Sequence, residues 1–351
     1  MIKLGNIQLL DCTLRDGGFV NDWMFGADVI TNIIRGLEDS RTEIIELGFL
    51  KNEPYSPERV VFNATEQIKK VVGGKKPGVL YAAMGELMNP LALDKLAPAE
   101  KDGLDIIRMM LWKTKRMPDG QVVDMLDEGF RYCKGLVEKG YRLCIQPVRT
   151  NQYSDDEFSG MVRRFSELEP MAIYVVDSWG TQNPENILHY MEIADQIVPE
   201  KTALGFHGHN SMMQALSITQ AVLGAGFSHD LIVDASVYGI GRSAGNLHTE
   251  LIAKYLNEEY GKKYRVLPIL KIYEDYISKI REREAWGYSI PYLLAATHNC
   301  NPAYAKYLSG QKKLGVEAME YVLTHLSAES KIIFSKQDAD DCLEEYRRRE
   351  R

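Results

Sequence analysis

Short apolar runs rich in β-branched residues alternate with segments of helical periodicity over most of this chain of 351 residues. Eight such runs precede residue 240, and most of them are followed by a segment long enough for a helix. The eight runs are residues 7–10, 43–49, 78–84, 104–111, 141–148, 172–177, 202–206 and 231–237. Eight strand–helix units in about 250 residues are typical of an α/β chain that closes into a (β/α)8 TIM barrel.

Helices are expected in the segments between these runs. The expected helical segments are residues 27–37, a part of 54–74, 120–139, 155–168, 184–197 and 210–223. Gly140 directly follows one of them and is a typical residue for a helix C-terminus. The structural alternative to a barrel is a doubly wound open sheet of six or seven strands. No Gly-x-Gly-x-x-Gly follows the first run, which counts against that alternative.

Polar side chains stand at the C-terminal ends of many of these runs. They are Arg15, Asp16, Glu46, Gln146, Arg149, Asp177, Ser178, His207, His209 and Asn246. In a closed barrel the C-terminal ends of all strands converge on one mouth, where the active site lies. In an open sheet the same side chains would be spread over a wide crevice. The distribution therefore favours the barrel and predicts a functional site at its mouth.

The strand–helix alternation stops after about Lys254. Residues 257–263 are polar and predict a linker, residues 267–284 predict a helix, and the last fifty residues predict amphipathic helices. We therefore expect two units. A catalytic barrel is expected at residues 1–257, and a helical C-terminal extension at residues 258–351 packs on the barrel or on a second subunit.

Composition excludes several classes of partner. The net charge of −7 argues against nucleic acid or an anionic membrane. The N-terminus has no signal-peptide pattern, and no apolar run approaches about 18 residues, so no membrane span is expected. The five cysteines are scattered and odd in number, which is typical of reduced thiols in a cytosol. A cytoplasmic protein is the resulting prediction.

Two imidazoles stand two residues apart in Gly205-Phe-His-Gly-His-Asn210. On a strand, residues i and i+2 face the same side, so His207 and His209 point together. Asp16 follows the first run, so one carboxylate and two imidazoles at strand ends can meet on one divalent cation. Imidazole, carboxylate and amide oxygen suit a first-row ion or Mg²⁺. Asp11 lies nearer the strand interior and is expected to form hydrogen bonds inside the barrel.

Three motifs together resemble the signatures of the DRE-TIM metallolyases. They are Leu10-Asp-Cys-Thr-Leu-Arg-Asp-Gly17, His207-Gly-His-Asn210 and Gly239-Ile-Gly-Arg-Ser-Ala-Gly-Asn246. The resemblance runs in order over about residues 5–255. That superfamily includes 4-hydroxy-2-oxovalerate aldolase, hydroxymethylglutaryl-CoA lyase, isopropylmalate synthase and homocitrate synthase. The pattern lies nearest the aldolase branch.

The resemblance implies a metal centre and a catalytic arginine. The implied metal ligands are Asp16, His207, His209 and Asn246, and the implied ion is Mg²⁺ or Mn²⁺, with Zn²⁺ as a further option. A 2-oxo acid such as pyruvate chelates such an ion, and the metal and the guanidinium of Arg15 stabilise the enolate formed when the bond at C3 breaks. The implied partners are a 2-oxo acid, an aldehyde, a dehydrogenase subunit and further copies of the chain.

Other polar residues at the mouth have less defined roles. Glu46 ends an apolar strand and is expected to orient Arg15 or a metal-bound water, with a structural ion pair as the alternative. The residues expected to contact the substrate are Gln146, Arg149, Asp177 and Ser178. The glycines of residues 239–245 suit a tight turn better than a phosphate site, although a phosphorylated substrate is compatible with them.

The chain departs from the family pattern at several positions. Phe19 stands where the aldolases have a general-base histidine, and Asp22, Tyr292 and His298 are the alternatives for that role. Residues 239–242 lack the glutamate of the condensing synthases, and residues 237–246 lack the cysteine of the acyl-CoA lyases. The prediction is a metal-dependent carbon–carbon lyase of the aldolase type. The alternatives are a Claisen-type synthase that joins an acyl-CoA to a 2-oxo acid, and a metal-binding partner subunit without catalysis.

Overall fold

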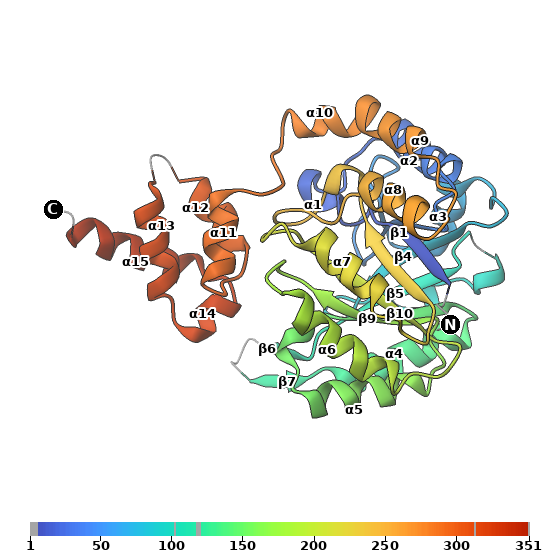
Figure 1. The fold of residues 1–351 in the computed structure, drawn as a ribbon, viewed down its shortest axis with the longest axis horizontal. Helices are drawn as coiled ribbons and strands as arrows, with labels where there is room; N and C mark the ends of the chain where they lie inside the picture. The colour runs from blue at the N-terminus through green and yellow to red at the C-terminus, as the bar shows by residue number, and fades with distance from the viewer. Residues whose placement is uncertain (1–5, 102, 117–120, 312–313, 350–351) are drawn as a thin grey trace.

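The computed structural model describes residues 6–101, 103–116, 121–311 and 314–349. Eight parallel strands form a closed barrel, because β1 pairs with both β2 and β11 (Figure 1). The strands in barrel order are β1 (Ile7–Asp11), β2 (Ile44–Leu50), β4 (Leu80–Glu86), β5 (Ile106–Leu111), β8 (Arg142–Pro147), β9 (Ala172–Asp177), β10 (Ala203–Gly208) and β11 (Leu231–Ala235). The predicted (β/α)8 barrel is therefore confirmed.

Helices cover the outer face of the barrel (Figure 1). They are α2 (Ala27–Asp39), α3 (Thr65–Val72), α4 (Leu126–Glu138), α5 (Asp155–Ser166), α6 (Pro184–Asp195), α7 (Ala215–Gly224) and α8 (Thr249–Glu259), and the short α1 (Gly18–Asn21) lies at the mouth. Local sequence sets their ends. Ser154 and Glu157 form a capping box at α5, and Gly140 with φ of 86° follows the end of α4.

Two of these helices begin later than the sequence pattern indicates. Helix α4 starts at Leu126 because Val122–Asp124 forms strand β7, which pairs with β6 (Thr114–Arg116) in a hairpin. Residues 117–120 lie outside the described part of the chain. Helix α7 starts at Ala215 because the side chain of Asn210 accepts the main-chain N–H of Ala215 at 3.1 Å and holds the preceding turn. A further short strand, β3 (Val61–Phe62), pairs with β2.

The barrel has two apolar layers, because successive residues of a strand face opposite sides. The inner layer includes Leu10, Ile44, Tyr174 and Ile232, all fully buried. The outer layer fills the space between the strands and the helices. All seven residues of β2 are buried, so the charge of Glu46 within that strand needs partners inside the protein.

The chain after α8 first stays on the barrel. Helix α9 (Val266–Ile272) packs against α2, a π-helical turn (Tyr273–Ile277) follows, and α10 (Ser278–Arg281) ends this segment. Residue 257, the expected boundary, lies within α8, and α9 of the expected extension packs on the barrel through α2. No helix in the described ranges is long and apolar enough to cross a membrane.

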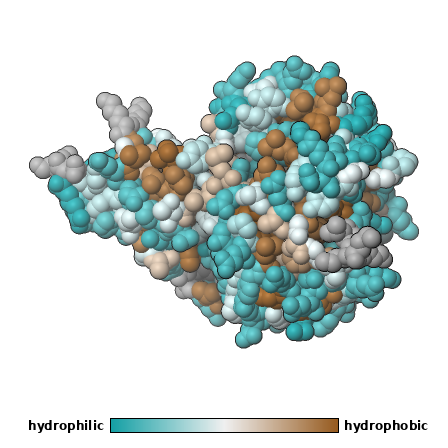
Figure 2. Space-filling view, in the orientation of Figure 1, coloured by the Kyte–Doolittle hydropathy of each residue, from teal (hydrophilic) through white to brown (hydrophobic). Residues whose placement is uncertain are grey.

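The last five helices form a lobe beside the barrel, here called the helical lobe (Figures 1 and 2). It comprises α11 (Ile290–Thr297), α12 (Ala303–Ser309), α13 (Val316–His325), α14 (Ala328–Ile332) and α15 (Lys336–Arg349). The lobe has a core of its own, with Tyr304, Val322 and Leu343 among its buried residues. Figure 1 places α11 and α12 on the side that faces the barrel.

Candidate metal centre

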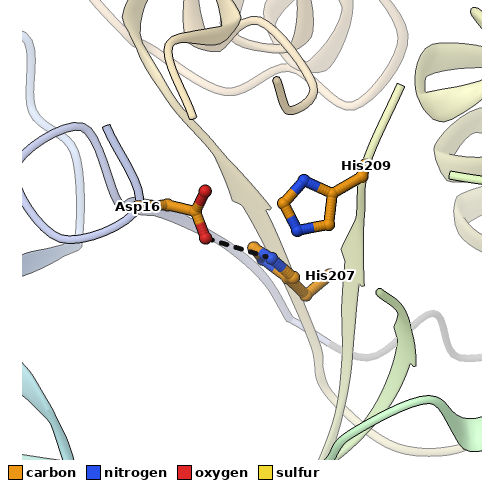
Figure 3. Close-up of side chains that lie close together, drawn as sticks. All are labelled: Asp16, His207 and His209. Carbon is orange, nitrogen blue, oxygen red and sulfur yellow. Dashed lines mark ion pairs between the residues drawn. The ribbon is translucent and has the colours of Figure 1, made fainter. Parts of the chain in front are cut away.

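Asp16, His207 and His209 meet at the barrel mouth (Figure 3). Asp16 lies in the loop after β1, His207 is in β10, and His209 follows the end of that strand. Each residue offers one ligand atom, and these atoms lie within 4.8 Å of one another. The distance from Oδ2 of Asp16 to Nε2 of His207 is 3.7 Å. All three side chains are buried, so the cluster is a closed set of donors that face a common centre.

The environment sets the protonation of two members of this cluster. Burial acts to raise the pKa of Asp16, but Arg15 and the two imidazoles outweigh it and hold that pKa below its usual range. Burial lowers the pKa of His209 to about 4, although Asp16 acts in the opposite direction. At neutral pH the carboxyl is therefore ionised and this imidazole is neutral. These are the forms that bind a metal ion.

Asn246 lies next to this cluster. The main chain of Asn246 pairs with that of His209 in an isolated antiparallel bridge. The side-chain Nδ2 of Asn246 donates to the carbonyl oxygen of Ile240 at 3.1 Å. Its Oδ1 is buried and has no hydrogen-bond partner among the described residues. A Cβ at Gly241 would lie 2.2 Å from Nδ2 of Asn246 and 2.7 Å from Oδ1 of Asp16, so both side chains reach the same glycine. The unpaired amide oxygen is a further oxygen donor beside the cluster.

A chain of buried ion pairs surrounds the cluster. Nε of Arg15 donates to Oε2 of Glu46 at 2.7 Å, and a second nitrogen of Arg15 contacts Asp16. The same Oε2 of Glu46 lies 2.7 Å from Nη1 of Arg108. Arg108 also contacts Asp234, whose Oδ2 lies 2.9 Å from Nδ1 of His207. These contacts connect Asp16 with His207 by a continuous series of buried charged side chains inside the barrel.

The arginine and carboxylate charges of this network do not cancel. Two guanidinium groups, Arg15 and Arg108, stand against three carboxylates, Asp16, Glu46 and Asp234, and two minus three leaves one negative charge. All five side chains are at most 3 % exposed, so the remaining charge is poorly solvated. A bound cation offsets it. The charge balance and the unpaired oxygen of Asn246 both fit a divalent metal ion.

A small cavity of about 50 Å³ opens beside Asp16, His207 and His209. Its apolar walls are Met84, Met110, Trp112, Val148 and Val176. Arg15, Phe19, Gln146, Ser178 and Arg242 complete the lining. Nε2 of Gln146 and Nε1 of Trp112 are buried and have no hydrogen-bond partner within the described ranges. The lining of the cavity thus includes both unpaired donors and the ligand cluster.

The other two residues expected to contact the substrate do not line this cavity. The carboxylate of Asp177 accepts the main-chain N–H groups of Thr181 and Gln182, both at 3.1 Å, and so holds the turn after β9. Burial raises the pKa of Asp177. The guanidinium of Arg149 lies 3.8 Å from the ring centroid of Trp179, and its main-chain N–H donates to Oγ of Ser178. Arg149 therefore contacts Ser178 through its main chain, and Asp177 holds the turn that contains Ser178.

Arg108 and Asp234 are the residues that sequence reasoning missed. Each is a single charge inside an apolar run, in Ile106–Leu111 and in Leu231–Ala235. That pattern is the available signal, because an isolated charge in a buried strand requires a partner. Asp11 forms hydrogen bonds inside the barrel, as expected. It accepts them from the N–H of Thr13 and the hydroxyl of Thr249.

The three residues considered as the general base in place of Phe19, which are Asp22, Tyr292 and His298, lie in different parts of the structure. Asp22 is exposed and pairs with Arg59, and Nε2 of His298 lies 2.8 Å from Glu320 in the helical lobe. Tyr292 of α11 lines a cavity that also contains Phe19. Among these three described residues, Asp22 and Tyr292 thus line cavities that include Phe19, and Tyr292 is the one that comes from the helical lobe.

A (β/α)8 barrel with a buried Asp–His–His cluster at its mouth defines a class of metal-dependent barrel enzymes. The HMGL-like family model matches residues 6–266, and the chain belongs to this family. It is accordingly a member of the DRE-TIM superfamily and a carbon–carbon lyase that depends on a divalent metal.

Comparisons with individual proteins agree with this assignment. The chain is 24% identical over 249 residues to oxaloacetate decarboxylase from Mycobacterium tuberculosis. The matched region covers 71% of this chain and 69% of the relative. It is 22% identical over 258 residues to 4-hydroxy-2-oxovalerate aldolase from Geobacillus genomosp. 3, with 72% and 70% covered. The HMG-CoA lyase structure from Brucella melitensis matches with a TM-score of 0.62 at 15% identity, over 79% of this chain and 99% of that chain. This last likeness shows the shared fold.

Proposed function

We propose that the protein forms or cleaves the carbon–carbon bond next to a 2-oxo acid such as pyruvate, in the manner of a 4-hydroxy-2-oxovalerate aldolase. The observation that supports this most is the buried cluster of Asp16, His207 and His209 with Arg15 beside it, facing one small cavity. We assign these three ligands and Asn246 to Mg²⁺ or Mn²⁺, with Zn²⁺ as a further option. When bound, the ion supplies positive charge that stabilises an enolate oxygen.

Arg15 is the proposed catalytic group of the chain. Its guanidinium lines the cavity and is held in place by the carboxylate of Glu46. A fixed guanidinium stabilises negative charge where the enolate oxygen develops, without reorganising during the reaction. Glu46 also pairs with Arg108, so we assign it a positioning role towards Arg15.

The 2-oxo acid is proposed to lie in the small cavity. The unpaired Nε2 of Gln146 and the hydroxyl of Ser178 are donors suited to its carboxylate. Arg149 and Asp177 are proposed to act through Ser178, by fixing the turn in which it lies. The methionine and valine side chains of the wall exclude water from the enolate.

Proton transfer to the second reactant is assigned to Tyr292. Burial raises the pKa of this phenol, with Arg242 acting in the opposite direction, so it is protonated at neutral pH. In the direction of synthesis it is suited to donate its proton to the aldehyde oxygen as the new bond forms. Phe19 at the usual base position cannot perform this step.

A second candidate function is decarboxylation of oxaloacetate. Loss of carbon dioxide from this 2-oxo acid gives the same pyruvate enolate and requires no base to remove a hydroxyl proton. The observation that favours it is Phe19, which replaces a basic group on the wall of the cavity. The relative from Mycobacterium tuberculosis bears the name of that activity.

We further propose a cytosolic enzyme that works as a homo-oligomer and delivers its aldehyde to a dehydrogenase partner. Five free cysteines support the reducing compartment. The helical lobe offers a second packed unit on which such a partner can dock.

The first experiment is deuterium exchange into the methyl group of pyruvate, followed by NMR with Mn²⁺ or Mg²⁺, with a chelator, and in His207→Ala. A matched control is His229→Ala, because His229 is also buried and pairs with a carboxylate away from the mouth. Exchange that requires the metal and His207 but not His229 supports the pyruvate enolate that both candidate functions share. Cleavage of 4-hydroxy-2-oxovalerate then supports the aldolase, and decarboxylation of oxaloacetate without that cleavage supports the second candidate. Neither reaction, with metal bound, would overturn both.

A further inference from the structure

A second cavity lies on the outer side of Phe19, between the barrel mouth and the helical lobe. Its volume is about 220 Å³, against about 50 Å³ for the cavity beside the metal ligands. Its barrel wall includes Val20 and residues 241–243, and its lobe wall includes Tyr292 and Lys306. Figure 2 shows the surface hollowed where the lobe meets the barrel. We call this space the outer cavity and the smaller one the inner cavity.

The two cavities are separated by a thin layer of side chains. Phe19 and Arg242 line both of them. The guanidinium of Arg242 lies 5.6 Å from the ring centroid of Phe19, and its main-chain N–H donates to Oδ1 of Asp16 at 2.8 Å. A substrate that reacts beside Asp16 and is too long for the inner cavity would have to extend past these two residues to reach the outer cavity.

Two cations face the outer cavity from opposite walls. Arg242 comes from the loop after β11, and Lys306 comes from α12 of the helical lobe. Neither side chain forms an ion pair with any residue in the described part of the chain. Glu284 also lines the cavity and offsets part of this charge. Phe19 and Trp286 supply apolar surface in the same lining, so the cavity combines apolar side chains with unpaired positive charge.

We propose that the outer cavity binds an anionic group, a carboxylate or a phosphate, at the far end of the second reactant, with Arg242 and Lys306 as its cationic contacts. This rests on the proposed function, because it places the reacting carbon of the aldehyde at the inner cavity. The aliphatic part then contacts Phe19, and the terminal anion lies between the barrel and the helical lobe. Charge-assisted hydrogen bonds from Arg and Lys favour such a group over a neutral one. The lobe thereby selects the second reactant.

The test compares aldehydes with the same number of carbon atoms in aldol addition to pyruvate. The pairs are butanal with succinic semialdehyde, and glyceraldehyde with glyceraldehyde 3-phosphate, so the two arms separate carboxylate from phosphate. We expect kcat/KM to be about tenfold higher for the charged member of one pair. Lys306→Gln and Arg242→Gln should lower this preference, and Glu284→Gln should raise it. The matched control is Arg283→Gln, a nearby exposed cation outside the outer cavity lining, which should leave it unchanged. An equal preference in wild type and Lys306→Gln overturns the proposal.

A binding measurement keeps the two proposals distinguishable. Calorimetric titration of chelator-treated full-length protein with succinate and with inorganic phosphate requires no catalysis. We expect saturable binding of at least one anion, weakened roughly fivefold in Lys306→Gln and unchanged in Arg283→Gln. Binding without pyruvate exchange would reject the enolate chemistry and retain the anion site. No difference between wild type and Lys306→Gln would reject the anion site, whether or not exchange occurs.

Discussion

Oδ2 of Asp234 accepts a hydrogen bond from Nδ1 of His207 at 2.9 Å, which leaves Nε2 of this imidazole facing Asp16. Burial acts to raise the pKa of Asp234, but Arg108 and His207 hold it below its usual value, so the group is an ionised acceptor. The carboxylate thus fixes the tautomer in which the lone pair of Nε2 points towards the ligand cluster. Carboxylates in this position orient metal-binding histidines in many metalloproteins.

Replacement of Asp234 by asparagine tests this arrangement. An amide nitrogen can donate to Nδ1 and so favour the tautomer with its proton on Nε2, where the metal should bind. We expect Asp234→Asn to weaken Mn²⁺ binding by about 10- to 100-fold, measured by calorimetry. Asp195→Asn is the matched control, because Asp195 lies 2.7 Å from Nδ1 of His229 away from the site. Wild-type affinity in Asp234→Asn would contradict the assignment of His207 as a ligand.

Arg108 is expected to stabilise the barrel interior through its ion pairs with two buried carboxylates. It is fully buried and contacts both Glu46 and Asp234. Arg108→Met leaves two buried carboxylates without this partner, so the free energy of unfolding should fall by about 3–5 kcal/mol in urea titrations. Arg164→Met removes an exposed pair with Asp127 and should cost at most about 1 kcal/mol. Similar small losses in both variants would show that the buried network contributes little to stability.

Gly241 gives room for two of the proposed ligands. An added Cβ would lie 2.2 Å from Nδ2 of Asn246 and 2.7 Å from Oδ1 of Asp16, so Gly241→Ala must displace them. We expect a large loss of metal affinity, with a far-ultraviolet circular dichroism spectrum like that of wild type. The control is Gly160→Ala in α5, where an added Cβ meets nothing within 4 Å. Metal binding that survives Gly241→Ala would place the ion elsewhere.

The buried carboxyl of Asp11 predicts a pH dependence of stability. Burial raises its pKa to about 6, although hydrogen bonds from Thr249 and Thr13 act against this. A raised pKa means that the folded state binds the proton more tightly than the unfolded state. The contribution of Asp11 to the free energy of unfolding is therefore full below pH about 4 and is lost as the pH rises through about 6. Asp11→Asn cannot ionise, so from pH 4 to 7 wild type should lose about 2 kcal/mol relative to it. Parallel curves from urea titrations would contradict a raised pKa.

The strand pattern predicted the barrel because buried parallel strands have apolar runs of similar length and spacing. The Asp–His–His cluster was also predictable, since His207 and His209 stand two residues apart at the end of one strand and Asp16 lies in the loop after another. Both features depend on short-range periodicity. The meeting of these residues at one mouth then follows from closure of the sheet alone.

The rest depended on contacts between distant segments. Nothing local to Arg108 indicates that it lies between Glu46 and Asp234, on two other strands. Likewise, the position of Tyr292 near Phe19 requires the path of the chain after α10. The distinction between Asp177 as a substrate contact and as a support for its own turn also needed the geometry of Thr181 and Gln182.

The separate core of the helical lobe has an evolutionary consequence. The proposed metal ligands and Arg15 belong to one packed unit, whereas Tyr292 and Lys306 belong to another. Mutations in the lobe can therefore change which molecule is accepted while the barrel retains its reaction. Exchange of this lobe between related proteins offers a route to new substrates in which neither core has to be repacked.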